Sequence, residues 1–267
     1  MHERERHRIM LSAVQARPVV TVQEFAALTD ASEATIRRDI ATLALQKRLR
    51  KVRGGAEALS ASPFGVVSGP SFDASQALNA AQKRAIAREA ALLCDDGDAI
   101  IINGGTTTFQ MVHMLTSLRL QVLTNSFPIA GHLVKHSKCT VLTPAGAIYR
   151  EQGLILSPFI DDGIAHFRAR RMFLGAQGVS AHGIAEADPL LIQSEQRLMR
   201  QADEIVVMVD ASKFRGRSSM IVAPLDRVAV VITDEGIEDA DAAMIEAAGI
   251  RLVVARAERA EGVSDVA

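Results

Sequence analysis

The sequence predicts a small helical module with a β-hairpin at the N-terminus, followed by a larger α/β domain with a mainly parallel sheet. Two observations lead to this fold class. Apolar residues recur at helical spacing up to about residue 45 and precede a short basic run. From residue 82 onward, helix-like and strand-like segments alternate. The chain has 267 residues, 48% of them hydrophobic, which is enough for one small module and one domain with a substantial core.

The N-terminal module begins with a helix expected over residues 4–15, where apolar residues alternate with polar ones. Thr21 followed by Glu24 predicts a capping box at the start of a second helix, because each side chain can satisfy the other's backbone donor. Ser32 is a suitable N-cap for a third helix that starts at Glu33. Three short helices in this order are typical of a helix-turn-helix.

The third helix has two chemically different faces when its residues are placed at about 100° per residue. Ile36, Ile40 and Leu43 form the apolar face, and Asp39 lies near it, where we expect it to hold an arginine in place. The opposite face carries small, hydroxyl and arginine side chains, which are suited to reading base edges in the major groove. The expected DNA contacts of this helix are Ser32, Thr35, Arg37 and Arg38.

Alternating basic residues before Gly54-Gly55 predict a hairpin wing that contacts DNA phosphates. The expected contacts are Arg48, Arg50, Lys51 and Arg53. Charge supports this division, since residues 1–57 carry 11 Lys and Arg against 7 Asp and Glu, a net charge of +4, whereas the rest of the chain carries −5. The alternative is a solvated basic loop beside an ordinary three-helix bundle.

The expected domains are a winged helix-turn-helix at 1–57, a linker at 58–80, a sensor domain at 81–257 and a flexible tail at 258–267. The sequence has no apolar run of membrane-spanning length and no apolar signal region, so we expect a cytoplasmic protein without a membrane partner. Cys94 and Cys139 form no metal or redox motif, and the seven histidines are scattered. We therefore expect neither a metal ion nor a cofactor.

The larger domain is expected to hold a parallel sheet with helices on both faces, because buried strands alternate with helices. The expected strands are 98–103, 120–124, 139–143, 171–175, 204–210, 227–233 and 250–254. The expected helices are 83–94, one that follows Thr108 and ends at about residue 116, 127–136, 157–167, 189–202 and 239–248.

Several polar residues follow these strands at the edge where parallel sheets bind ligands. Glycine permits close backbone approach to a phosphate, threonine hydroxyls can donate to it, and lysine can neutralise it. The expected effector contacts are Asn103, Gly104, Gly105, Thr106, Thr107, Asn125, Ser126, Gly146, Tyr149 and Lys213. Each residue also has a simpler explanation: a Gly-Gly-Thr turn can bind nothing, an asparagine can cap a helix, and a lysine can be an exposed loop charge.

These motifs together resemble the DeoR family of bacterial sugar-metabolism regulators. The resemblance covers nearly the whole chain and includes Lys83 before Ala85-Ile86-Ala87, Phe173-Leu174-Gly175-Ala176 and Asp210-Ala211-Ser212-Lys213. It implies a winged helix-turn-helix joined to a sensor related to ribose-phosphate isomerase and glucosamine-phosphate deaminase. It also implies operator DNA as partner, a phosphorylated sugar or polyol as effector, repression of a catabolic operon, and a homo-oligomer (a dimer or a tetramer).

The chain departs from the family pattern in two places. Asn103 stands where the family commonly has an aspartate, and Arg170 and Arg171 stand where an acidic residue is common. An arginine near the site would favour a more acidic effector, such as a sugar-acid phosphate, unless it faces solvent.

The leading hypothesis is a DNA-binding regulator, most simply a repressor, with no catalytic residues. The rival hypothesis is a sugar-phosphate isomerase or deaminase with an accessory DNA-binding module. That chemistry needs a general base, for which Glu186, Asp188, Glu195 and His182 are candidates. A DNA-binding protein without a sensor function is a third reading, which the phosphate-binding loop argues against.

Overall fold

The computed structural model describes residues 2–16, 19–46, 48–57, 72–150, 152–159, 161–216 and 220–257. The chain divides into two compact units, Met1–Ala77 and Leu78–Ala267. The division falls within the range 58–80 that the sequence predicts as a linker, and helix α4 (Phe72–Ala77) lies in that range. Residues 58–71 and the predicted tail at 258–267 lie outside the described residues.

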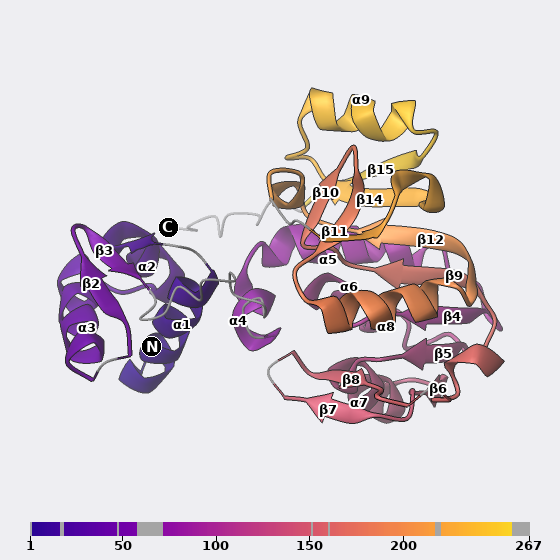
Figure 1. Cartoon of the computed structure of the whole chain (residues 1–267), viewed down its shortest axis with the longest axis horizontal. Coiled ribbons are helices and arrows are strands. Elements are labelled where there is room, and N and C mark those ends of the chain that lie inside the picture. The colour runs from indigo at the N-terminus through magenta and orange to yellow at the C-terminus, as the bar shows by residue number, and fades with distance from the viewer. Residues whose placement is uncertain are drawn as a thin grey trace, which may run out of the picture. The chain divides into compact units, whose positions relative to one another are not determined.

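Up to residue 57, the described part of the N-terminal unit consists of three helices and a small antiparallel sheet (Figure 1). The helices are α1 (Glu3–Ala16), α2 (Val22–Thr29) and α3 (Glu33–Leu45). The strands are β1 (Val20–Thr21), β2 (Arg50–Val52) and β3 (Gly55–Glu57), in the order β1-β3-β2. Because β2 and β3 form an antiparallel hairpin directly after α3, the predicted winged helix-turn-helix is confirmed.

The caps predicted for this unit are present. Thr21 and Glu24 form the reciprocal capping box of α2, and the Ser32 side chain accepts from the backbone N–H of Thr35 at the start of α3. The backbone favours glycine at both wing positions, for a different reason at each. Gly54 has φ +83°, and a Cβ on Gly55 would lie 2.1 Å from the Val20 carbonyl oxygen on the paired strand. The core consists mainly of Met10, Val14, Val20, Val22, Phe25, Ile36, Ile40, Leu43 and Leu49.

The second unit is built on a seven-stranded sheet in the order β15-β14-β12-β9-β4-β5-β6, and every neighbouring pair in it is parallel. The strands are β4 (Ala99–Ile102), β5 (Gln121–Thr124), β6 (Thr140–Leu142), β9 (Ala169–Leu174), β12 (Ala202–Met208), β14 (Val230–Asp234) and β15 (Arg251–Ala255). All seven strands predicted for this sheet are present, which confirms the predicted α/β class.

Helices cover both faces of the sheet, and side chains from successive strand positions enter two separate cores. Ile100 and Ile102 enter the core under α5, α6 and α7, whereas Ile101 enters the core under α8 and α9. The helices are α5 (Ala80–Ala91), α6 (Thr106–Val112), α7 (Phe127–His136), α8 (Pro189–Met199) and α9 (Asp239–Ala247). None of the described helices is long and apolar enough to cross a lipid bilayer.

Two smaller sheets were not predicted. The hairpin β7 (Ala147–Tyr149) and β8 (Leu154–Leu156) precedes β9. A three-stranded antiparallel sheet is formed by β10 (Gly178–Ser180), β11 (Gly183–Glu186) and β13 (Met220–Ala223).

The helix predicted over 157–167 is wrong. Within the described part of that range, the structure has one 3-10 turn, η1 (Ile164–His166). Gly163 precedes this turn with φ +83°, a left-handed conformation that interrupts an α-helix.

The order of the strands creates a switch point between β4 and β9. From β4 the chain continues outward through β5 to β6, and it then returns to β9 on the other side of β4. The loop after β4 leads to α6 on one face, and the chain after β9 leads through β10 and β11 to α8 on the other face. Open parallel sheets bind ligands at the carboxyl ends of the strands at such a point.

Candidate functional site

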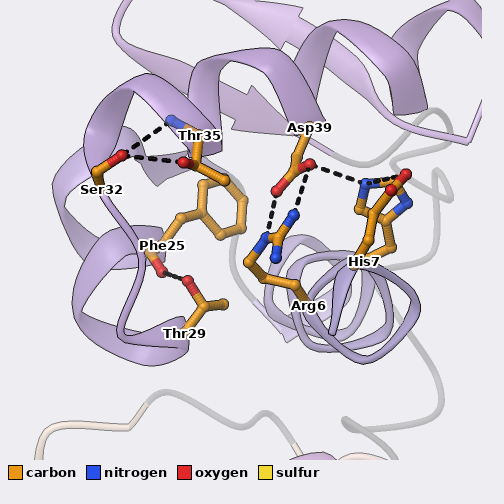
Figure 2. Close-up of polar contacts among 8 residues, drawn as sticks. Arg6, His7, Phe25, Thr29, Ser32, Thr35 and Asp39 are labelled. Carbon is orange, nitrogen blue, oxygen red and sulfur yellow. Dashed lines mark hydrogen bonds and ion pairs between the residues drawn. The ribbon is translucent and has the colours of Figure 1, made fainter. Parts of the chain in front are cut away.

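The helix α3 is anchored on its buried side by an ion pair with α1 (Figure 2). The Asp39 carboxylate accepts hydrogen bonds from Arg6 Nε at 2.5 Å and Arg6 Nη2 at 3.1 Å, and it lies 3.1 Å from His7 Nε2. Burial alone would raise the pKa of Asp39, but the hydrogen bonds from Arg6 and His7 outweigh it, so that pKa lies below its ordinary value. The predicted role of Asp39 in holding an arginine is confirmed.

The opposite side of α3 is exposed, as the helical spacing predicts. Ser32 and Thr35 are joined by their hydroxyl groups at 2.9 Å, so both help to cap the helix (Figure 2). Arg37 donates to Glu33 at 2.7 Å on the same exposed surface. Among the described residues Arg38 has no ion-pair partner, and it is exposed to solvent at the middle of the helix. Arg38 is therefore the side chain of α3 best placed to contact a base.

The basic residues of the wing are all on the surface. Arg48, Lys51 and Arg53 are exposed, and Arg50 is exposed but pairs with Glu57 on the neighbouring strand. Within the described part of the chain, Arg48, Lys51 and Arg53 form no ion pair, so three of the four predicted phosphate contacts present their charge without an acidic partner.

A cleft of about 90 Å³, here called the first cleft, lies at the switch point of the larger unit. The loops after β4, β9 and β12 form its walls, with Glu186 from β11 and Glu195 from α8. The structure brings five of the ten predicted effector contacts together here. They are Gly104, Gly105, Thr106, Thr107 and Lys213.

Three other predicted contacts are buried behind the loop after β4 and support it. Asn103 Nδ2 donates to Glu195 Oε1 at 2.7 Å. Asn125 Oδ1 accepts from the backbone N–H of Gly104 at 2.9 Å. Ser126 caps α7 by accepting from the backbone N–H of Ile129. The side chains of Asn103 and Asn125 are therefore each hydrogen-bonded to a residue that lines the first cleft.

The last two predicted contacts belong to the β7–β8 hairpin region. Gly146 lies just before β7, and a Cβ there would be 2.5 Å from the Leu156 carbonyl oxygen. Tyr149 lines a second cleft, which is described below, and does not line the first. The hairpin does reach the loop after β4, because a Cβ on Gly104 would lie 2.0 Å from Leu154 Cδ2. Packing by β8 therefore favours glycine at position 104, because a Cβ there would require the Leu154 side chain to move.

Lys83 was not predicted as a site residue, although it lies close enough to Lys213, which lines the first cleft, for their charges to interact. Lys83 is buried on α5, and burial lowers its pKa to about 8, with Asp210 opposing and Lys213 reinforcing the shift. A signal was available in the sequence, because Lys83 lies on the same helical face as Ala87 and Ala90, which are both buried. A lysine within an apolar stripe indicates a functional group.

Glu186 and Glu195 were considered only as bases for an enzyme, yet both line the first cleft. Burial raises the pKa of Glu195 well above its ordinary value, and the charge of Glu186 adds to the shift. Burial also raises the pKa of Glu186. A carboxyl group that keeps its proton brings less negative charge to the cleft and can donate a hydrogen bond. The other two candidates do not line it, since Asp188 caps α8 and His182 is exposed in a turn.

The arginines that depart from the family pattern lie at the start of β9, whereas the first cleft lies at the carboxyl ends of the strands. Arg171 donates to Glu204 at 2.7 Å, and Arg170 lies 3.4 Å from Asp95. Neither arginine lines the first cleft, so neither supports a more acidic effector.

Comparison with known proteins agrees with this organisation. Residues 6–62 match the model of the DeoR-like helix-turn-helix domain, and residues 78–235 match that of the DeoR C terminal sensor domain. The HTH-type transcriptional regulator UlaR of Shigella dysenteriae serotype 1 (strain Sd197) is 29% identical over 253 residues, which cover 95% of this chain and 99% of UlaR. UlaR of Shigella flexneri has the same identity and coverage.

Solved structures with partial similarity include ribose 5-phosphate isomerase A of Methanocaldococcus jannaschii (20% identity, 49% of this chain and 52% of that chain, TM-score 0.37). Another is translation initiation factor eIF-2B of Pyrococcus horikoshii OT3 (17% identity, 78% of this chain and 80% of that chain, TM-score 0.38). The sensor-domain model alone spans more than half of the chain, and the related full-length proteins are transcriptional regulators. The chain therefore belongs to the DeoR family and is a DNA-binding transcriptional regulator, not an enzyme.

Proposed function

We propose that this regulator represses a carbohydrate or polyol catabolic operon, and that a phosphorylated sugar-type effector bound in the first cleft controls its affinity for double-stranded operator DNA. The observation that supports this proposal best is the composition of the first cleft. Its glycines, two threonines and a lysine come from loops far apart in the sequence and meet at the switch point of the sheet.

The two ends of such an effector differ in chemistry, and so do the two sides of the first cleft. Backbone N–H groups of the loop after β4, the hydroxyls of Thr106 and Thr107, and the ammonium of Lys213 can all donate to a phosphate. Glu186 and Glu195 can exchange hydrogen bonds with sugar or polyol hydroxyls. In this proposal Asn103 contributes to the site indirectly, because its side chain donates to Glu195 and holds that carboxyl group in position.

On the DNA side, Arg38 and Arg37 with Thr35 and Ser32 face the major groove in this proposal, and Arg48, Arg50, Lys51 and Arg53 contact phosphates. A single winged helix-turn-helix reads a short half-site, so a cytoplasmic dimer or tetramer supplies two units at a set spacing. The effector then acts by binding one arrangement of the paired units better than the other.

The experiment that tests the proposal is fluorescence anisotropy of the protein on DNA from upstream of its own operon. The complex is titrated with phosphorylated sugars, polyols and sugar acids, and with their unphosphorylated counterparts. Release of the DNA by one phosphorylated compound supports a repressor with an effector of this class. Tight DNA binding that no phosphorylated compound changes would contradict the assignment of the first cleft.

Replacing Arg38 by alanine is expected to weaken operator binding about 10- to 100-fold, because one base contact by arginine contributes about 1–3 kcal/mol. Effector binding, measured by isothermal titration calorimetry, should stay unchanged. The matched control is Arg8→Ala, which removes the same charge from an exposed position on α1 outside the expected contacts. Equal losses in the two variants would mean that Arg38 contributes general charge and no base contact.

Effector binding is also expected to weaken as the pH rises above about 8. The Lys83 pKa of about 8 means that its ammonium form, which attracts a phosphate, is lost through this range. Phosphate monoesters are already dianionic there, since their second pKa is about 6. Kd should rise by up to about tenfold per pH unit above 8, the limit for one linked proton.

The variant Lys83→Met should lose this alkaline dependence, whereas Arg84→Ala, an exposed neighbour on α5, should retain it. Calorimetric titrations between pH 7 and 9.5 measure both. If the Kd of Lys83→Met still rises above pH 8, another group is responsible for the titration.

A further inference from the structure

The larger unit contains a second cleft of about 160 Å³ that the function proposed above does not use. It lies between the β7–β8 hairpin, the segment that leads into η1, and helix α8, which packs beside β8 (Figure 1). Its polar lining consists of Tyr149, Ser157, Asp162, Gln193, Ser194 and Arg197. Pro144, Ile155, Leu156 and Leu190 are among the apolar residues of its walls.

Helix α8 separates the second cleft from the first. Leu190, Gln193, Ser194 and Arg197 have the spacing of a single helical face, and all four line the second cleft. Glu195 points about 150° away from the centre of that face, at 100° per residue, and lines the first cleft. The two clefts are thus on opposite sides of one helix.

Asp162 is the feature of the second cleft that indicates a ligand. Its side chain is 2% exposed, and its Oδ1 lies 2.8 Å from Arg197 Nη2 and accepts from the backbone N–H of Ile164. Its Oδ2 is also buried, and among the described residues it has no hydrogen-bond partner. Buried carboxylate oxygens in proteins are normally hydrogen-bonded, so this atom calls for a donor from a molecule in the cleft.

The neighbouring hydroxyl groups are arranged to complement such a molecule. Ser194 Oγ accepts from Asn125 Nδ2 at 3.4 Å, and Ser157 Oγ accepts from the backbone N–H of Phe159 at 3.2 Å. Each serine therefore keeps its O–H group as a donor, while Asp162 Oδ2 can only accept in its charged form. Tyr149 adds a hydroxyl that can donate and accept. Alternating donors and acceptors match the hydroxyl groups of a sugar or polyol.

The charge of the second cleft distinguishes its ligand from that of the first. Arg197 and Asp162 neutralise each other, and a phosphate placed here would meet the free oxygen of a carboxylate. The volume is below that of pockets for drug-sized ligands, about 300–1,000 Å³, so the ligand is small. We infer that the second cleft binds an uncharged polyhydroxylated molecule, a free monosaccharide or polyol, at a site separate from that of the phosphorylated effector.

Isothermal titration calorimetry on the full chain tests this inference. The probes are D-ribose, D-xylose, D-glucose, ribitol, xylitol and D-glucitol, each without phosphate. At least one is expected to bind, and Asp162→Asn should weaken its binding at least tenfold. Because Asp162→Asn also alters a buried ion pair, Tyr149→Phe serves as a second variant that removes one hydroxyl from a residue 42% exposed. We expect it to weaken binding about threefold to tenfold, the loss of one hydrogen bond.

The matched control is Ile148→Ala, an exposed neighbour on β7 that does not line the cleft, and its Kd should equal that of the natural chain. If none of the six compounds binds at concentrations up to about 10 mM, the inference is overturned. That limit corresponds to a binding free energy of about −3 kcal/mol. Binding that Lys213→Ala abolishes and Tyr149→Phe leaves unchanged also overturns it, because the compound then occupies the first cleft. Neither result bears on the phosphorylated effector, whose binding is tested separately.

Discussion

Replacing Asp39 by alanine is expected to lower the free energy of unfolding of the N-terminal unit by about 3 kcal/mol. The change leaves Arg6 and His7 without the carboxylate that both contact, inside the interface between α1 and α3. Removing one partner of a buried pair costs about 3–5 kcal/mol. The lower end applies here because 12% of the Arg6 side chain is exposed.

Hydrogen exchange with mass spectrometry measures this effect within the full chain, because it reports the peptides of α1 and α3 separately from those of the larger unit. Glu5→Ala removes an exposed carboxylate of α1 and is the matched control. Asp39→Ala should also lose operator binding, since α3 loses its orientation. Unchanged exchange in α1 and α3 would show that the ion pair contributes nothing to the stability of the unit.

The same ion pair predicts that the stability of the N-terminal unit depends on pH. The pKa of Asp39 is lower in the folded state than in the unfolded chain, where it is about 3.9. Its stabilisation is therefore fully present above that value and is lost as the pH falls through the folded-state pKa. Asp39→Asn should abolish this contribution, which distinguishes the carboxylate from the other acidic groups of the unit.

Replacing Lys213 by alanine is expected to raise the Kd for the phosphorylated effector about 100-fold. Lys213 is a basic residue lining the first cleft, and a hydrogen bond to a charged group contributes about 1.5–3 kcal/mol. The variant should bind operator DNA with normal affinity and should respond to the effector only at correspondingly higher concentrations. Anisotropy titrations with the effector on the protein–DNA complex measure both quantities.

Arg215→Ala is the matched control for Lys213→Ala, since Arg215 follows it closely, is exposed and pairs with Glu238. Thr106→Val provides a second test, because it removes a donor from the opposite wall of the first cleft and keeps a similar volume. A normal effector response in both Lys213→Ala and Thr106→Val would place the effector elsewhere. A loss of DNA binding in both would contradict the separation of reading and sensing between the two units.

The local features of this protein could be predicted from sequence because each depends on residues close together in the chain. The capping box of Thr21 and Glu24 and the cap at Ser32 need side chains only three positions apart. The helical spacing of α3 placed Asp39 toward the core, although it did not identify Arg6 as the partner. Alternation of apolar segments with helices was enough for all seven strands of the parallel sheet.

The composition of the candidate sites was decided only by the tertiary structure, because contacts between distant segments depend on strand order and packing. Tyr149 was expected beside the glycine-threonine loop, but the β7–β8 hairpin places it in the second cleft. Gly104 was expected to make room for a phosphate, whereas the structure also places the side chain of Leu154 against it. Lys83, Glu186 and Glu195 were not predicted as effector contacts, because burial shifts their pKa values and no short sequence pattern records how deeply a side chain is buried.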